Sequence, residues 1–321
     1  MSSVTTLALP FFGLIFLGFS CGKLARLPHD GLAWLNFFII YVSLPCLFYK
    51  LIAATPFEQL SNWPFIIGTT LSTGAAFLIA LGGGLWLGRG GLREGAIQGA
   101  LGGYANVGYM GPGLTLAALG QGASVPTALI FVFDCALMFS AVPFLMALGG
   151  SGKLKLGETV LYVLVRVFTH PFNIATIIGV IAAYFRYQPP AAIDTMITYL
   201  KDAAAPCALF VLGVTVALRP VKRVAPEAPF LLTVKLVLHP LIVWCMLSLI
   251  GDFDPVWVYT AILMASLPPA LNVFVMAQQY NVYVERASAG ILIGTVVSVA
   301  TVTGLLVLIT SGALPANLFA P

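Results

Sequence analysis

Long uninterrupted apolar runs constrain this chain more than any other feature of its sequence. The segments 65–80 and 291–309 carry no charged side chain, and segments of this kind supply the ~20 residues that a helix needs to cross a bilayer core. Only 8% of the residues are charged, against roughly 25% in a soluble domain. A water-soluble fold of this length could not cover its surface with so few charges, so the sequence predicts an integral membrane protein.

The fold class follows from the backbone. In hydrocarbon, every backbone polar group needs a partner within the protein, which leaves helices or a closed barrel. The apolar runs lack the two-residue alternation of barrel strands, so we expect an all-α polytopic protein. Ten transmembrane helices are predicted, at 4–22, 31–53, 63–87, 95–117, 124–148, 165–186, 197–217, 229–250, 255–280 and 287–311.

Several functional classes are excluded by what the sequence lacks. The net charge of +4 is too small to indicate a nucleic-acid partner, and the five cysteines are scattered without metal-ligand or disulfide spacing. The sequence has no Gly-rich phosphate loop of the Lys-Ser/Thr type, which argues against direct use of ATP. No cofactor is expected. Lys23 and Arg26 follow the first apolar run instead of preceding it, which is not the pattern of a cleavable signal peptide.

The basic residues indicate an orientation. Ten Lys or Arg lie in the odd-numbered loops between the predicted spans, two lie in the even-numbered loops, and both tails have none. Basic loops remain in the cytoplasm, so we expect both termini on the periplasmic or extracellular side. The ten are Lys23, Arg26, Arg89, Arg93, Lys153, Lys155, Arg219, Lys222, Arg223 and Arg286, and the two are Lys50 and Arg186.

The chain also resembles itself. At a shift of 161 residues, each proline between positions 10 and 45 falls on another proline. Chance identity is the alternative, but duplication accounts better for six matches. We predict a first five-helix repeat at 1–160 and a second, inverted five-helix repeat at 161–321, as in many secondary carriers. The matched pairs are Pro10 with Pro171, Phe11 with Phe172, Gly18 with Gly179, Pro28 with Pro189, Pro45 with Pro206, and Cys46 with Cys207.

One span in each predicted repeat is unsuited to a regular helix. The segment 102–113 holds five glycines and a proline, and the segment 266–272 holds two adjacent prolines. Glycine weakens a helix, and proline removes a donor and clashes with the preceding turn. We therefore expect broken helices at the fourth and ninth spans, the paired positions that mark the binding site of a carrier.

A break of this kind favours an anion. The free amides and the positive dipole end of a half-helix would face the middle of the membrane, where Asn106 and Asn272 can add neutral donors. The alternative is that glycine and proline only permit kinks and close packing. The candidate substrate-binding residues are Asn106, Gly108, Tyr109, Gly111, Pro112, Pro268, Pro269 and Asn272.

Three stretches resemble the auxin efflux carrier family, in particular its bacterial malonate-carrier-like branch. One departure is that Pro112 stands one position earlier than the proline of the family pattern, and we expect the break to persist. The matching stretches are 104–111 (YANVGYMG), 205–210 (APCALF) and 266–273 (SLPPALNV), continued by Phe274, Ala277, Gln278, Gln279 and Tyr280.

The resemblance carries expectations beyond the residues themselves. It implies a scaffold of helices 1, 2, 6 and 7 that can form a homodimer, and a moving transport domain of helices 3–5 and 8–10 in which the two broken helices cross. It also implies a substrate among auxin and the small mono- and dicarboxylates, malonate-like anions included, and a location in the bacterial inner membrane.

Three ionisable residues stand out in the fifth and eighth predicted spans. Asp134 lies about nine residues, or ~13 Å, into the fifth span, where a carboxylate is costly and marks function. His239 has a similar depth in the eighth span, and Lys235 shares its face. We expect these residues to form a proton- or charge-coupling network. The alternatives are a protonated Asp134 bound to a carbonyl and a Lys235 that snorkels to the interface.

Two further pairs have milder interpretations. Arg166 and His170 precede Pro171 near the cytoplasmic start of the sixth span, where anchoring at the membrane surface is expected. Lys201 and Asp202 adjoin near the outer end of the seventh span. A solvated pair at a helix end is preferred there over an outward gate.

Together these features predict a secondary transporter that moves a small organic anion by alternating access, surrounded by membrane lipids. It is not expected to be an enzyme. Coupling to protons, to sodium or to neither stays open. The alternatives are a sodium-coupled symporter of the bile-acid type, for which few sodium ligands are present, an intramembrane enzyme, and a channel.

Overall fold

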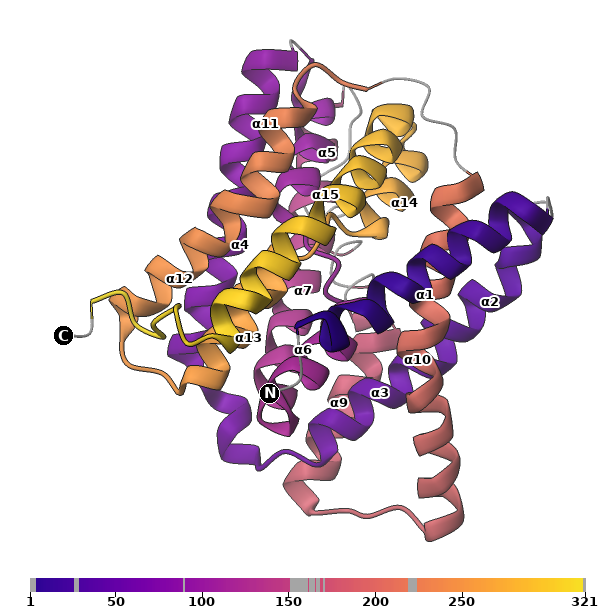
Figure 1. Ribbon diagram of the computed structural model, residues 1–321, viewed down its shortest axis with the longest axis vertical. Coiled ribbons are helices and arrows are strands. Elements are labelled where there is room, and N and C mark those ends of the chain that lie inside the picture. Colours follow the sequence, from indigo (N-terminus) through magenta and orange to yellow (C-terminus); the bar gives the residue numbers. More distant parts are fainter. Residues whose placement is uncertain are drawn as a thin grey trace. The chain divides into compact units, whose positions relative to one another are not determined.

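The computed structural model describes residues 4–25, 29–88, 90–150, 161, 165, 168–169, 171–218 and 224–319. Regular structure in these residues is helical, apart from one isolated β-bridge between Ala105 and Pro269. Each of the ten predicted ranges contains helix (Figure 1). The prediction of an all-helical protein is therefore confirmed.

The described helices follow one another along the chain. They are α1 (Val4–Ala25), η1 (His29–Leu32), α2 (Ala33–Phe38), η2 (Ile39–Ser43), α3 (Leu44–Ala53), η3 (Phe57–Ser61), α4 (Trp63–Gly88), α5 (Leu92–Gly103), α6 (Gly111–Leu119), η4 (Gln121–Ala123), α7 (Ser124–Leu148), α9 (Pro171–Phe185), α10 (Ala191–Leu218), α11 (Ala228–Thr233), η5 (Val234–Leu238), α12 (His239–Ile250), α13 (Pro255–Ser266), α14 (Leu271–Tyr280) and α15 (Val284–Thr310).

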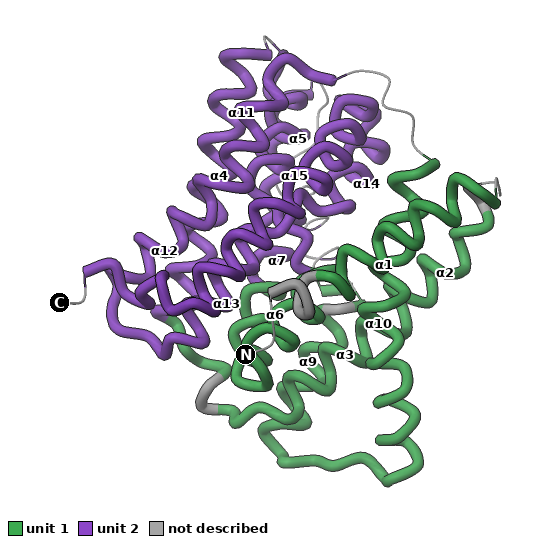
Figure 2. Tube along the Cα trace, viewed as in Figure 1, with its two compact units in different colours: residues 1–63, 108–132, 168–219 green, residues 64–107, 133–167, 220–321 purple. Residues whose placement is uncertain are grey.

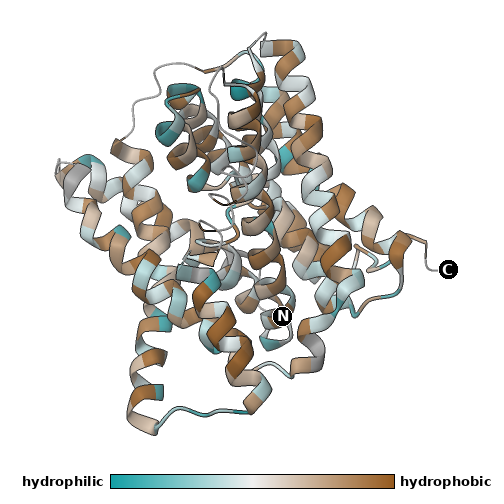
Figure 3. Cartoon of the chain, turned by 180° about the vertical axis from the view of Figure 1, so that it is seen from behind, coloured by the Kyte–Doolittle hydropathy of each residue, from teal (hydrophilic) through white to brown (hydrophobic). Residues whose placement is uncertain are grey.

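Six helical stretches of the described chain are long and apolar enough to cross a membrane, and hydrophobic residues run along them (Figure 3). Three shorter apolar helices accompany them, at Leu9–Ala25, Asn173–Phe185 and Pro255–Ser266. Length and composition thus agree with an integral membrane protein. The six are Ala33–Ala53, Trp63–Gly88, Gln121–Leu148, Ala191–Leu218, Ala228–Ile250 and Val284–Thr310.

The seventh span begins earlier than predicted. Helix α10 starts at Ala191 instead of near 197, because no helix breaker follows Pro190 and Asp194 favours the first turn of a helix. Lys201 and Asp202 therefore lie well inside the helix. The prediction that this pair marks a helix end is wrong.

Within the described residues, two spans contain a π-helical turn, and each turn is followed by a proline. The turn η2 precedes Pro45, and η5 precedes Pro240. Because proline donates no amide hydrogen and its ring crowds the previous turn, the backbone widens there instead of breaking.

The chain divides into two compact units (Figure 2). Unit 1 comprises 1–63, 108–132 and 168–219, and it includes α1, η2, α3, α6, α9 and α10. Unit 2 comprises 64–107, 133–167 and 220–321, and it includes α4, α5 and α11–α15. Helix α7 contributes its first part to unit 1 and the rest to unit 2.

In unit 1, α1 and α10 touch through their backbones. A Cβ atom on Gly18 would lie 2.1 Å from the carbonyl oxygen of Phe210, and one on Gly213 would lie 2.0 Å from that of Ile15. Gly18 and Gly22 also form the G-x-x-x-G spacing that lets membrane helices approach closely. Larger residues at these glycines would push the two helices apart.

In unit 2, α4 lies along α11 and α12. Gly68 faces Leu247 and Ile250, and Gly83 faces the ring of Phe230. These contacts fix the helix that carries Thr73 beside the helix that carries His239, which positions the polar cluster described below.

A buried polar contact in unit 2 ties the starts of α11 and α15 to the middle of α5. Gln98 of α5 and Tyr283 at the start of α15 each donate a 2.7 Å hydrogen bond to Oε1 of Glu227, the residue immediately before α11. Burial and the bond to Glu227 raise the pKa of the Tyr283 hydroxyl, so it remains a donor. The contact holds the middle of α5 to the start of α15.

Some predictions fall outside the described residues. They are the repeat boundary at 160/161, the proposed anchors Arg166 and His170, and the basic loop residues Arg26, Arg89, Lys153, Lys155, Arg219, Lys222 and Arg223.

Candidate functional site

The ninth predicted span is interrupted by its proline pair. Helix α13 ends at Ser266 and α14 begins at Leu271, and the four residues between them include Leu267 and Ala270 in extended conformation. Pro268 and Pro269 cannot donate to the last turn of α13, so the helix stops there. The predicted break is present at its predicted position.

The fourth predicted span is also interrupted, but over a narrower stretch than its glycines suggest. Helix α5 continues to Gly103 and α6 starts at Gly111, so the irregular segment is 104–110. Within the described chain, glycines with positive φ occur only at Gly120 and Gly312. The glycines around this break therefore do not supply unusual backbone angles.

Close packing is their role instead. A Cβ on Gly103 would lie 2.8 Å from the backbone N and Cα of Phe77, and one on Gly102 would lie 2.3 Å from Cβ of Ala80. Glycine thus brings the end of α5 against the backbone of α4. This outcome agrees with the packing alternative for these two residues, while the break itself remains.

The end of α5 crosses the break in α13–α14. The amide of Asn106 donates to the carbonyl of Pro268 over 2.8 Å, and the amide of Ala270 donates to the carbonyl of Tyr104 over 2.9 Å. Ala105 and Pro269 face each other in an antiparallel bridge. Both strands of the crossing lie in unit 2 and are almost fully buried. Four predicted site residues, Asn106, Pro268, Pro269 and Asn272, are thereby brought together.

Hydrogen-bond donors gather at this crossing. The Asn106 side chain is 1% exposed, and its Nδ2 has no partner among the described residues. The amides of Leu271 and Asn272, the first two of α14, lack intrahelical acceptors by geometry, and the helix dipole is positive at that end. The side-chain amide of Asn272 donates to the Tyr104 hydroxyl over 3.3 Å, and that hydroxyl lies 3.2 Å from Sγ of Cys135.

The other four candidate binding residues lie in unit 1, at the start of α6. Pro112 occupies the first turn of α6, where its missing amide costs nothing. Gly108 lies against the ring of Phe131, and Tyr109 is buried. The carbonyl of Gly111 accepts a 2.9 Å bond from the Thr115 hydroxyl. A binding role for Gly108, Tyr109, Gly111 and Pro112 stays a prediction.

The three ionisable residues of the predicted coupling network also cluster in unit 2. Lys235 donates to the backbone carbonyl of Ala265, and its Nζ lies 3.1 Å from Nδ1 of His239. Nε2 of His239 lies 3.2 Å from the Thr73 hydroxyl. Asp134 adjoins Thr73 and Lys235, and its Oδ1 has no hydrogen-bond partner among the described residues.

Burial decides one of the alternatives. The Lys235 side chain has no exposed surface, and Asp134 and His239 are 2% and 1% exposed. A snorkelling lysine would place its ammonium at the interface, whereas this one turns inward to the end of α13. The snorkelling interpretation is wrong.

Three participants were missed from the sequence. Thr73 is a polar residue inside a long apolar helix, and Tyr104 stands two residues before Asn106, so both positions carried a weak signal. The carbonyl of Ala265 could have been found directly. It stands four residues before Pro269, which is the spacing at which a proline leaves a helical acceptor without its donor.

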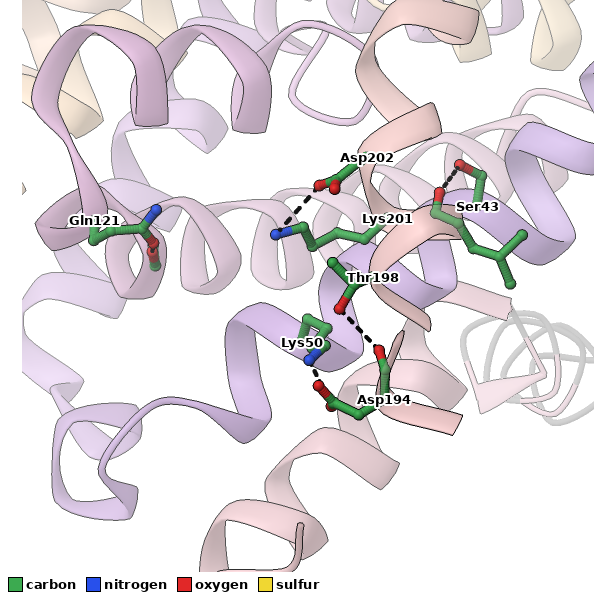
Figure 4. A network of polar contacts seen from close by, with 9 residues as sticks. Ser43, Lys50, Gln121, Asp194, Thr198, Lys201 and Asp202 are labelled. Carbon is green, nitrogen blue, oxygen red and sulfur yellow. Dashed lines mark hydrogen bonds and ion pairs between the residues drawn. The ribbon is translucent and has the colours of Figure 1, made fainter. Parts of the chain in front are cut away.

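Unit 1 holds ion pairs of a different kind (Figure 4). Lys50 of α3 pairs with Asp194 of α10 at 2.5 Å, with side chains 24% and 42% exposed. Lys201 and Asp202 pair at 3.4 Å, and their side chains are 33% and 64% exposed. Exposed pairs contribute roughly 0–1 kcal/mol. The solvated interpretation of Lys201 and Asp202 holds, although the pair lies inside α10.

Comparison with known proteins identifies relatives over the full length. The sequence profile of a family described as "Membrane transport protein" matches residues 3–306. A protein of Rhizobium meliloti named "Putative malonate transporter" is 51% identical over 99% of this chain and 100% of its own length. An "Uncharacterized transporter" of Methanothermobacter thermautotrophicus is 26% identical over 89% of this chain and 91% of its own.

Plant proteins match a smaller part. "Auxin efflux carrier component 4" of Arabidopsis thaliana is 29% identical over 143 residues, which are 41% of this chain and 22% of that protein. The family consists of transporters, so the expectation that the chain is not an enzyme is confirmed. The helical fold, the crossing at Ala105 and Pro269, and the match over residues 3–306 agree: the chain belongs to the membrane transport protein family that includes the auxin efflux carriers.

Proposed function

We propose that this protein is a secondary active transporter that carries a small malonate-like carboxylate across the membrane by alternating access. One observation carries the proposal. At the buried crossing of α5 with α13–α14, the unpartnered side-chain amide of Asn106 and the backbone amides of Leu271 and Asn272 at the start of α14 are available to a ligand that accepts hydrogen bonds. The 51% identity to a protein named as a malonate transporter supports the substrate class.

The crossing favours an anion because it offers donors without a full charge. A helix N-terminus carries about +0.5 of an elementary charge, and an asparagine amide adds two donor hydrogens. Such a site can hold a carboxylate and release it again, since no buried ion pair must be broken. A second carboxylate, as in malonate, would find Asn272 on the first turn of α14.

The surrounding architecture is part of the proposal. Ten spans form two inverted repeats, both termini face the periplasm, and the protein lies in a bacterial inner membrane. Helices 3–5 and 8–10 move as a transport domain against a scaffold of helices 1, 2, 6 and 7, which dimerises. The interrupted spans and the excess of basic residues in the odd loops support this arrangement.

Asp134 and His239 belong to a coupling network, with Lys235 between them and the crossing. Thr73 of α4, Asp134 of α7 and Ala265 of α13 are the groups that surround Lys235 and His239. Paired buried ionisable groups in a membrane protein commonly relay protons. We expect uptake to depend on pH, and Asp134→Asn and His239→Ala to flatten that dependence.

The test is uptake into proteoliposomes that contain the purified protein. Labelled malonate, succinate, acetate and indole-3-acetate are compared under separately imposed pH, sodium and voltage gradients. Saturable malonate uptake, accelerated by unlabelled malonate on the opposite side, is expected. Uptake of no carboxylate above protein-free liposomes would refute the proposal, and a strict requirement for a sodium gradient would favour a symporter of the bile-acid type.

Two site variants and one control complete the experiment. Asn106→Ala and Asn272→Ala should each raise the KM for malonate by roughly tenfold, because each removes a hydrogen bond to a charged ligand. Gln121→Ala changes an exposed amide at the start of η4 and should leave uptake unchanged. Unchanged KM in both asparagine variants would place the binding site elsewhere.

A further inference from the structure

The proline pair of the ninth span removes two donors and leaves their acceptors behind. In an uninterrupted helix, the amides of residues 268 and 269 would bond to the carbonyls of Met264 and Ala265. Both positions are proline, so neither bond can form. Met264 accepts instead from Leu267 over 3.4 Å. The carbonyl of Ala265 has lost its helical donor at the negative end of α13.

Lys235 supplies the replacement. Its Nζ donates to the Ala265 carbonyl, and the side chain is completely buried. A carbonyl oxygen at the negative end of a half-helix is the kind of group that coordinates a monovalent cation in transporters with broken helices. In this chain the same place is taken by an ammonium group that is covalently part of the protein.

The other contacts of Lys235 show that its site is built for a cation. Nδ1 of His239 lies 3.1 Å from Nζ and accepts from it, so the proton of a neutral imidazole is on Nε2 and is donated to Thr73. Two acceptors thus point at one ammonium group. Asp134 is the neighbouring acidic residue, and it interacts electrostatically with Lys235. Buried charges persist only when partners of this kind compensate them.

We infer that Lys235 is a tethered cation, that is, a cation covalently attached to the protein, at the break between α13 and α14. Its ammonium group occupies the position at the Ala265 carbonyl that a bound sodium ion would occupy in a sodium-coupled carrier. The inference rests on the proposed transport function. It has a definite consequence: carboxylate transport by this protein needs no monovalent metal ion, and removal of the lysine side chain creates a site that such an ion, or a small alkylammonium ion, can occupy.

The experiment compares the wild-type protein with Lys235→Ala in proteoliposomes. Malonate uptake is measured with sodium, potassium, ethylammonium or the bulky cation N-methylglucamine on both sides. Wild-type uptake should be the same in all four. Lys235→Ala should lose on the order of tenfold or more in N-methylglucamine, because a buried acceptor is left unpaired. It should recover severalfold in sodium or ethylammonium, and Lys235→Arg should retain part of the activity.

A charge-neutral pair of variants separates the cation from simple charge balance. If Lys235 only neutralises Asp134, the double variant Lys235→Met with Asp134→Asn would restore uptake to the level of Asp134→Asn alone. A tethered cation predicts that the double variant stays as impaired as Lys235→Met. Restoration by the double variant, or a wild-type protein that requires sodium, would overturn the inference.

Thermal unfolding in detergent covers the case in which transport cannot be measured. Sodium or ethylammonium should raise the melting temperature of Lys235→Ala relative to N-methylglucamine, and neither should affect the wild type. A saturable rise in the wild type would show an open cation site and refute the inference. If the variant does not fold, the wild-type measurement still decides. Absence of carboxylate transport together with this pattern would refute the proposed substrate and leave the tethered cation standing.

Discussion

The two interrupted spans solve the same problem with different residues. In the span of α5 and α6, the break covers residues 104–110, and the flanking glycines serve close packing. In the span of α13 and α14, the break covers only four residues and is caused by two prolines. A glycine keeps its amide donor, whereas a proline loses it. In the second break, the two prolines remove the amides that would reach the carbonyls of Met264 and Ala265, and Lys235 donates to the carbonyl of Ala265 instead.

This difference explains where the charge is found. The glycine-flanked end of α5 contributes only neutral groups to the crossing, namely the backbone and the side chain of Asn106. The end of α13, which the prolines cause, contributes the carbonyl of Ala265, and this carbonyl accepts a hydrogen bond from Lys235. One break needs small residues around it, and the other needs a buried cation. Four substitutions would break or sharpen this contrast.

The largest effect is expected where a glycine touches backbone. Gly103→Val would place Cβ 2.8 Å from backbone atoms of Phe77, which cannot rotate away as a side chain can. Overpacking of this kind costs about 3 kcal/mol, so the yield of monodisperse protein on size-exclusion chromatography should collapse. Gly82→Val is the matched control, since nothing lies within 4 Å of its added Cβ. A well-behaved Gly103→Val protein would show that close packing does not fix the first break.

The next prediction contrasts Pro269, in the second break, with Pro112, at the start of α6. Pro269→Ala restores an amide that can donate to the carbonyl of Ala265 in competition with Lys235. Malonate uptake should fall by roughly tenfold, because Lys235 loses a hydrogen bond from its charged group. Pro112→Ala should change uptake by less than about twofold, because an amide in the first turn of a helix has no intrahelical acceptor and its absence costs little. Equal effects of the two substitutions, measured at matched protein levels, would end the distinction between the breaks.

A smaller change is expected at the crossing itself. Tyr104→Phe removes a hydroxyl that accepts from Asn272 and contacts Cys135. The KM for malonate should rise roughly three- to tenfold, because Asn272 loses a partner that orients it. Tyr109→Phe is the comparison, since the Tyr109 hydroxyl makes no hydrogen bond within the described residues. A larger effect at Tyr109 would move the site toward the start of α6.

The smallest effect belongs to Gly108, inside the first break. A Cβ there would lie 3.2 Å from the ring of Phe131, which is stacked on Phe48 at 4.0 Å. The ring edge can yield slightly, so Gly108→Ala should cost about 1 kcal/mol or less and leave uptake intact. Loss of uptake with unchanged thermal stability would show that this break works through flexibility and not through packing.

Much of the fold could be predicted because each span has its own signal. The apolar runs and their flanking turn residues placed α4, α7, α11–α12 and α15 within a few residues of their observed ends. The interrupted spans were predictable from Pro268, Pro269 and the glycines. The predicted irregular segment of the first break, 102–113, is wider than the observed one, 104–110. Glycine composition does not distinguish a helix that packs closely from a helix that ends.

The site was predictable only in part. Asn106, Asn272, Asp134, Lys235 and His239 stood out as polar residues in apolar segments. Their partners could not be predicted, since the contact of Lys235 with Ala265 depends on how helices far apart in sequence pack. The division into units also follows from packing, and it separates Gly108 from Val107, where the sequence gives no sign of a boundary.

The π-helical turns have a consequence for how such membrane sequences are compared. Each turn carries a polar side chain that reaches a carbonyl on another helix: Ser43 bonds to Leu200 over 2.6 Å, and Lys235 bonds to Ala265. A wider turn adds one residue, which shifts the angular phase of everything before it by about 100°. A helical wheel drawn straight through Pro45 or Pro240 would assign such side chains to the wrong face. The phase of a span should be reset at a central proline before its lipid-facing and buried sides are assigned.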